Sequence, residues 1–503
     1  MGHARKTIDP VARFGALRFE DRWDGLPDSL RSRVEPTPLP DAELVDFSPA
    51  TAEAINLDPA AAADPELPAF LAGQRLPQGA APTATAYAGH QFGNFVPQLG
   101  DGRAISLGQV SDRFGQPWDL QLKGCGRTPY SRWADGRAVL RSTIREHLCS
   151  EAMAGLGIPT TRSLGLVVSS ERIQRETLEP GAALLRAAPS HIRFGHYEYV
   201  FYRQEYELLK PLADYVITQH FPHLRGHRAP YRQWLTEVME LTAWLVAQWQ
   251  AVGFVHAVLN TDNMSILGLT IDYGPFAFMD AYDPKFTPNH SDPAGRYAYE
   301  NQPLAAEWNF SRLLQATLPL LSDDPEEAVE IGTHILDRFQ PEYQRQYNSQ
   351  MRAKLGLKTA DREDESLMDD LLERMAASGA DFTRSFRALC QVSRDGRGDD
   401  FFLDEFADRD AASSWLAAYR QRLEAEPADD RARQLEMCRA NPAYVLRTHL
   451  AQAAIEQATA GDYTEVERLR RLLERPFDEQ PDMAGYAALP PDWAQGIELS
   501  CSS

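Results

Sequence analysis

The segment 256–274 constrains the fold of this chain more than any other. It reads HAVLNTDN from His256 to Asn263 and continues to IDYG at residues 271–274. A His, an Asn seven residues later and a nearby Asp-x-Gly form the spacing at which nucleotide-binding catalytic loops place an amide and a carboxylate on Mg²⁺. The Asp that usually stands two residues after the His is replaced by Val258, whose side chain cannot accept a proton.

Asp262 is the carboxylate nearest to this vacant position. It could act as the proton acceptor if the loop is reshaped. Asp272, in the Asp-x-Gly step, is the expected metal-binding carboxylate, together with Asn263. Asp and Asn also begin turns and cap helices, so a purely structural role for Asp262 and Asn263 stays open.

The groups that precede this segment follow the order of a protein kinase. A glycine-containing loop, LGDGR at residues 99–103, is followed by Lys123 on a predicted strand and Glu146 on a predicted helix. Phosphoryl-type chemistry needs a backbone loop over the phosphates, a cation on them and an anion to position that cation. The order predicts an α+β, atypical protein-kinase-like fold with two lobes: a β-rich N-lobe, then a helical C-lobe with a helical C-terminal extension.

Local patterns predict the elements of the N-lobe. Residues 104–110 and 118–123 favour a β-hairpin, and the alternation in the second strand points Lys123 away from its apolar side. Residues 137–154 favour a helix with Leu140, Ile144 and Leu148 as its buried stripe. We expect an irregular N-terminal wrap over 1–85, the N-lobe over 86–230, the catalytic core of the C-lobe over 231–300 and the helical extension over 301–503.

Each of these signals has a simpler interpretation. Gly100 and Gly102 suit a tight turn as well as an anion-binding loop. Lys123 and Glu146 could be unrelated surface charges, because such charges are common. Arg186 and Arg193 could grip a polyphosphate or pair with acidic surface loops.

Composition excludes several classes of function. The net charge of −21 argues against general binding to nucleic acid or to anionic membranes. The five cysteines have no C-x-x-C spacing, so neither a zinc knuckle nor a disulfide framework is indicated. The start of the chain has no apolar signal-peptide core, and we expect a cytoplasmic protein.

Several motifs resemble the selenoprotein O family. They are residues 87–94 (YAGHQFGN), 99–103, 122–132 (LKGCGRTPYSR), 260–268 (NTDNMSILG) and the ending CSS at 501–503. The family is a pseudokinase family with a kinase-like fold in which ATP is bound in an inverted orientation. The resemblance implies that AMP is transferred from ATP to Ser, Thr or Tyr hydroxyls of partner proteins.

The resemblance also implies site residues. Glu146 would pair with Lys123, Asp262 would accept the proton, and Asn263 and Asp272 would hold Mg²⁺, with Mn²⁺ as a possible substitute. The residues implied to bind the nucleotide are Gly100, Gly102, Arg103, Lys123, Asp135, Gly136, Arg186, Arg193 and Asp272.

The chain departs from the family in two places. Ala257 stands where the family often has Gly, and Pro288 stands where some bacterial members carry a cysteine that can pair near the C-terminus. Cys501 takes the place of selenocysteine and could be a redox-reactive thiol or a harmless terminal cysteine.

These features predict a protein adenylyltransferase. The alternatives are transfer of UMP, conventional protein phosphorylation, a catalytically silent nucleotide-binding scaffold, and a redox role for Cys501. The sequence carries no signal for an oligomeric state.

Overall fold

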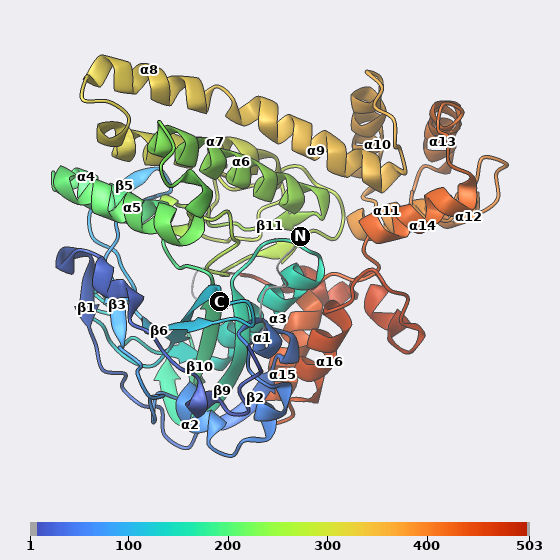
Figure 1. Ribbon diagram of the computed structural model, residues 1–503. Helices are drawn as coiled ribbons and strands as arrows, with labels where there is room; N and C mark the ends of the chain where they lie inside the picture. The colour runs from blue at the N-terminus through green and yellow to red at the C-terminus, as the bar shows by residue number, and fades with distance from the viewer. Residues whose placement is uncertain (1–7, 500–503) are drawn as a thin grey trace.

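The computed structural model describes residues 8–499; Cys501 lies outside them. Strands dominate the N-terminal part of the chain and helices the remainder (Figure 1). The predicted α+β class, with a β-rich N-lobe before a helical C-lobe, is confirmed. Within residues 8–499, none of the helices combines the length and the apolar character needed to cross a bilayer.

One large antiparallel sheet forms the N-lobe. Its strand order is β1-β3-β6-β7-β10-β9-β2, with β8 paired to β10. Two small hairpins, β4–β5 and β11–β12, lie outside it. The strands are β1 (Arg31–Arg33), β2 (Glu43–Phe47), β3 (Thr83–Thr85), β4 (Gly89–Gln91), β5 (Asn94–Val96), β6 (Ala104–Ser111), β7 (Pro117–Lys123), β8 (Ala138–Val139), β9 (Arg162–Gln174), β10 (Leu178–Ala188), β11 (Phe254–Val255) and β12 (Ala277–Phe278).

The predicted hairpin is confirmed as β6 and β7. Asp112 fixes the turn, because its Oδ1 accepts hydrogen bonds from the backbone N–H groups of Phe114 at 2.7 Å and Gln116 at 2.8 Å. Lys123 is the last residue of β7 and lies opposite Ala104 on β6 and Leu184 on β10. The sheet therefore holds this lysine from both sides.

The predicted helix at 137–154 forms as α3 (Leu140–Gly155) and begins three residues later than expected. Residues 138–139 form the short strand β8 instead, because their backbone groups pair with β10 in the sheet. Leu140, Ile144 and Leu148 are buried, which confirms the predicted stripe.

The helices that follow α3 fall into three groups, whereas α1 and α2 lie in the N-lobe (Figure 1). Helices α4 to α9 form a layer beside the sheet, and α10 to α14 form a cluster at one end of that layer. The last two return to the N-lobe and pack on α3, and α16 also contacts β2. The helices are α1 (Pro49–Ala54), α2 (Leu67–Leu71), α4 (Phe194–Tyr202), α5 (Leu209–His220), α6 (Pro230–Ala251), α7 (Gln302–Thr317), α8 (Pro325–Leu336), α9 (Phe339–Leu355), α10 (Asp364–Ser378), α11 (Phe382–Leu389), α12 (Asp399–Leu403), α13 (Arg409–Leu423), α14 (Asp430–Ala440), α15 (Thr448–Thr459) and α16 (Thr464–Leu473).

A buried ion pair fastens α16 to the sheet. Arg470 Nε donates to Asp46 Oδ2 at 2.7 Å, and the same oxygen lies 2.9 Å from His147 Nε2 on α3. Burial alone would raise the pKa of Asp46, but His147 and Arg470 outweigh it and hold that pKa below its usual value. The two ends of the chain are therefore joined through one charged cluster.

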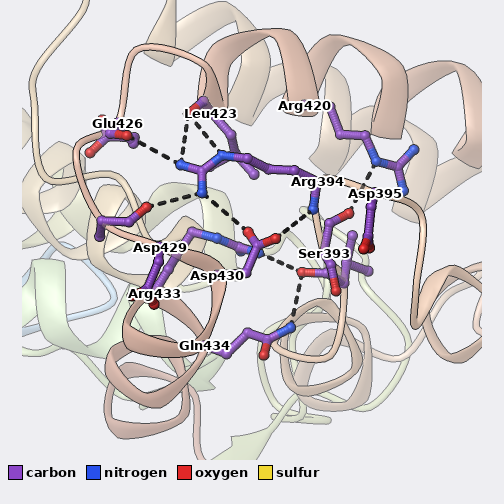
Figure 2. A network of polar contacts seen from close by, with 12 residues as sticks. Ser393, Arg394, Asp395, Arg420, Leu423, Glu426, Asp429, Asp430, Arg433 and Gln434 are labelled. Atoms are coloured by element: carbon purple, nitrogen blue, oxygen red, sulfur yellow. Dashed lines mark hydrogen bonds and ion pairs between the residues drawn. The ribbon is translucent and has the colours of Figure 1, made fainter.

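Arginines hold the loops of the C-terminal helical cluster (Figure 2). The guanidinium of Arg394 donates to the carbonyl oxygens of Leu423 at 2.9 Å and Glu426 at 3.2 Å, and its backbone N–H donates to Asp430 Oδ2 at 3.0 Å. These bonds supply donors for the carbonyl of Leu423, the last residue of α13, and for that of Glu426 in the connection to α14. They fix how α13 is connected to α14.

Candidate active site

A cavity of about 820 Å³ gathers nearly all of the predicted site residues. It is lined by the loop before β6, the end of β7, the loop after β7, β10 and the segment 258–275. Glu146 stands behind the wall rather than in the lining. The predicted residues that line the cavity are Gly100, Gly102, Arg103, Lys123, Asp135, Gly136, Arg186, Arg193, Asp262, Asn263 and Asp272.

The glycine loop is built around buried Asp101. Its Oδ2 accepts hydrogen bonds from the backbone N–H of Thr85 at 2.8 Å and from Thr85 Oγ1 at 2.6 Å. Gly100 adopts φ +132°, and a Cβ there would stand 2.6 Å from the ring of Tyr130. The glycine is therefore required by both conformation and space.

Lys123, Glu146 and Arg186 form one buried charge cluster. Lys123 Nζ and Arg186 Nε each donate to a different carboxylate oxygen of Glu146. Burial lowers the pKa of Lys123 to about 8, with the neighbouring Arg186 adding to the effect. Burial would raise the pKa of Glu146, but Arg186 and Lys123 outweigh it and keep that pKa below normal. The interpretation as unrelated surface charges is wrong for this pair.

Arg186 extends the cluster to Asp272. Its Nη2 donates to Asp272 Oδ1 at 2.6 Å, and Arg193 Nη1 donates to the other carboxylate oxygen. Against the opposing effect of burial, the two arginines hold the pKa of Asp272 well below its usual value. The side chain of Asp272 remains 25% exposed toward solvent, so it keeps access to a ligand.

Hydrogen bonds from side chains to backbone carbonyls stabilise the segment that begins at His256. His256 Nε2 hydrogen-bonds to the carbonyl oxygen of Ile271 at 2.8 Å, which ties the two halves of the segment together. Ala257 adopts φ +65°, in the left-handed region that favours glycine. Asn263 Nδ2 donates to the carbonyl oxygen of Val258 at 2.9 Å. These contacts fix the conformation of the loop between Val258 and Asn263.

Asp262 is a buried carboxylate with one free oxygen. Its Oδ2 accepts from Gln91 Nε2 at 3.1 Å, whereas Oδ1 has no hydrogen-bond partner among the described residues. Burial raises the pKa of Asp262 to about 7, although Gln91 and Arg193 oppose the rise. A carboxylate with this pKa can accept a proton near neutral pH.

Gln91 is the contact that sequence reasoning missed. It lies on β4, and the hairpin β4–β5 is anchored to the catalytic segment by a second bond, in which the backbone N–H of His90 donates to Thr261 Oγ1 at 2.7 Å. The motif at residues 87–94 indicated a family resemblance, but its sequence did not predict that this hairpin would contact the catalytic segment.

Asp135 and Gly136 lie at the outer side of the cavity. Both carboxylate oxygens of Asp135 accept from Arg175, at 2.7 and 2.9 Å. Gly136 adopts φ +72°, and a Cβ there would stand 2.2 Å from the backbone of Gly126. These residues shape the loop after β7.

Comparisons with known proteins show which family the chain resembles over its length. The family model described as protein adenylyltransferase SelO matches residues 13–474. A protein nucleotidyltransferase YdiU of Myxococcus xanthus is 50% identical over 494 residues, which cover 98% of this chain and 100% of that protein. A protein of the same description from Thioalkalivibrio sulfidiphilus is 51% identical over 491 residues, or 97% of this chain and 99% of that protein.

Proposed function

The chain belongs to the SelO family of protein nucleotidyltransferases, and on that premise we propose that it transfers AMP from ATP to Ser, Thr or Tyr hydroxyls of target proteins. The observation that carries this proposal is the free Oδ1 of Asp262, which lies in the same cavity as four buried cationic side chains. A proton acceptor beside phosphate-binding cations is the pairing that nucleotidyl transfer needs.

The cations suit the triphosphate. Lys123 and Arg186 are buried in the cavity wall, Arg103 is half-buried there, and the backbone of Gly100 and Gly102 forms the adjoining loop. In our proposal the β- and γ-phosphates lie against these cations, and the α-phosphorus faces Asp262. This is the inverted orientation, with the nucleoside toward the outside.

Asn263 and Asp272 fit a Mg²⁺ or Mn²⁺ ion. The amide nitrogen of Asn263 is used by Val258, so its oxygen is the atom left for a cation. Because Mg²⁺ commonly takes only one or two protein oxygens besides phosphates and water, this donor set is sufficient. A bound Mg²⁺ would neutralise charge on the phosphate oxygens.

The reaction that follows is a single displacement. The target hydroxyl oxygen attacks the α-phosphorus, the bond from that phosphorus to the bridging oxygen breaks, and pyrophosphate leaves. The hydroxyl proton passes to Asp262 Oδ1. Lys123 and Arg186 stabilise the charge that develops on pyrophosphate.

Labelled ATP tests the proposal. The protein is incubated with Mg²⁺ and a target-protein mixture, using ATP labelled on either the α- or the γ-phosphate or, in a parallel reaction, UTP labelled on the α-phosphate. We expect protein-bound label from α alone, lost in Asp272→Ala and Asp262→Asn and kept in the control Asp482→Asn, which changes an exposed carboxylate. Label from γ alone would indicate phosphorylation, stronger labelling from UTP would indicate UMP transfer, and the absence of label would indicate a silent scaffold.

A further inference from the structure

The indole of Trp133 stands almost fully exposed at the rim of the cavity. It is 91% exposed, yet it belongs to the cavity lining. Trp133 lies in the loop 127–136, which follows directly after the strand that ends at Lys123. An exposed tryptophan beside a binding cavity offers a flat apolar surface that no part of the fold uses.

The backbone that carries Trp133 is anchored. Arg127 donates to the carbonyl oxygen of Ala134 from Nε at 2.7 Å and to that of Trp133 from Nη2 at 3.2 Å. The loop also bonds to the glycine loop, because Thr128 Oγ1 donates to the carbonyl oxygen of Asp101 at 2.7 Å. The chain thus holds the backbone in place and leaves the indole free.

The other aromatic rings of the lining are occupied by a neighbouring ring or cation, except that of Tyr130, which is buried and bonds through its hydroxyl to Ser32 Oγ at 3.0 Å. Within residues 8–499, no ring or cation contact with the indole of Trp133 is found. The occupied rings are Tyr87, covered by Arg193 at 4.8 Å; Phe92, against Tyr297 at 5.2 Å; and Tyr273, against Phe276 at 5.5 Å.

The inner part of the cavity is unsuited to a nucleobase. Its charged groups, among them Lys123, Arg186 and Asp272, are bonded to one another and favour phosphates and a cation over a neutral ring. If the phosphates lie there, the base has to lie toward the rim, on the side where the indole stands.

We propose that Trp133 is the platform on which the base of the nucleotide stacks. The inference rests on the proposed function, since it requires the triphosphate to occupy the inner cations. Stacking on an aromatic side chain contributes to the binding of any base and is strongest for a purine.

Calorimetric titration separates the base from the phosphates. The full-length protein is titrated with Mg²⁺-ATP and, separately, with Mg²⁺-tripolyphosphate, which has the phosphates without the base. We expect Trp133→Ala to weaken ATP binding by about 5- to 150-fold and to leave tripolyphosphate binding unchanged. Trp133→Phe should keep ATP binding within about threefold of wild type, because a phenyl ring also stacks.

Trp493→Ala is the matched control, because Trp493 is 53% exposed and lies outside the cavity lining. It should bind both ligands as wild type does. Equal ATP affinity in wild type and Trp133→Ala would overturn the stacking role. A wild-type protein that binds neither ligand would overturn the proposed function itself.

Discussion

Replacing Gly89 by Ala should slow AMP transfer about a hundredfold while leaving ATP binding largely intact. Gly89 begins β4, and a Cβ at this position would stand 2.5 Å from Asp262 Oδ1 and 2.9 Å from Asp262 Cγ. Its φ is not in the positive region, so alanine can adopt the same backbone. The perturbation is therefore one methyl group pressed against the proposed proton acceptor.

The magnitude follows from that overlap. Ordinary contact with a Cβ begins at 3.4 Å, so the carboxylate or the hairpin has to move by about 0.9 Å. A misplacement of about 1 Å in an active site costs about a hundredfold in rate, which corresponds to about 2.7 kcal/mol in the activation free energy. Overpacking should also cost about 1–3 kcal/mol in stability.

The assay compares Gly89→Ala with Gly485→Ala. A Cβ at Gly485 would meet nothing within 4 Å, and its φ is also outside the positive region, so this control adds the same methyl group harmlessly. Initial rates are measured with α-labelled ATP, and ATP affinity by calorimetry. We expect ATP affinity within about threefold of wild type, because Lys123 and Arg186 are not displaced.

Two results would refute this reasoning. A transfer rate within threefold of wild type in Gly89→Ala would show that the position of Asp262 does not limit the reaction. Loss of ATP binding together with transfer would show that the hairpin supports the whole cavity rather than the proton acceptor.

Three further predictions concern titratable side chains. The kcat/KM of AMP transfer should rise with pH to a plateau, with a midpoint near 7, because Asp262 accepts a proton only when ionised and burial raises its pKa to about 7; Asp262→Asn should abolish this rise. Glu146→Gln should lower the thermal midpoint of unfolding, because Lys123 loses its anionic partner. ATP should raise this midpoint more in the variant than in wild type, because the phosphates replace the lost anion; scanning fluorimetry measures both effects. Iodoacetamide at pH 7, followed by peptide mass spectrometry, should modify Cys438 before the other described cysteines, because the hydrogen bond from Cys390 lowers the pKa of Cys438 and its side chain is the least buried of the four.

Local patterns were enough to predict the N-lobe around Lys123. Strict alternation over residues 118–123 gave the strand and the direction of the lysine, and a spacing of four residues gave the buried stripe of α3. Their order along the chain then predicted the ion pair between Lys123 and Glu146. Each of these predictions uses a pattern within one strand or helix, or the order in which the strands and helices follow one another along the chain.

Contacts between distant segments could not be predicted in this way. Gln91 and Asp262 are 171 residues apart, and the bond between them depends on how a short hairpin folds back on the C-lobe. Strands β1 and β3 have three residues each, too few to show an alternating pattern. The sheet, rather than local preference, also determined that α3 starts at Leu140.

The bond between Asp46 and Arg470 can form only late in the synthesis of the chain. The two residues are 424 positions apart, so at about 5–20 residues per second the ribosome needs about 20 to 85 seconds to deliver the arginine after the aspartate. During that interval the growing chain carries a carboxylate without its guanidinium partner and an α3 surface not yet covered by α15 and α16. The packing of α3 and the charge pair of Asp46 are therefore completed only when translation is nearly finished, and a product that stops before Arg470 lacks the guanidinium partner of Asp46.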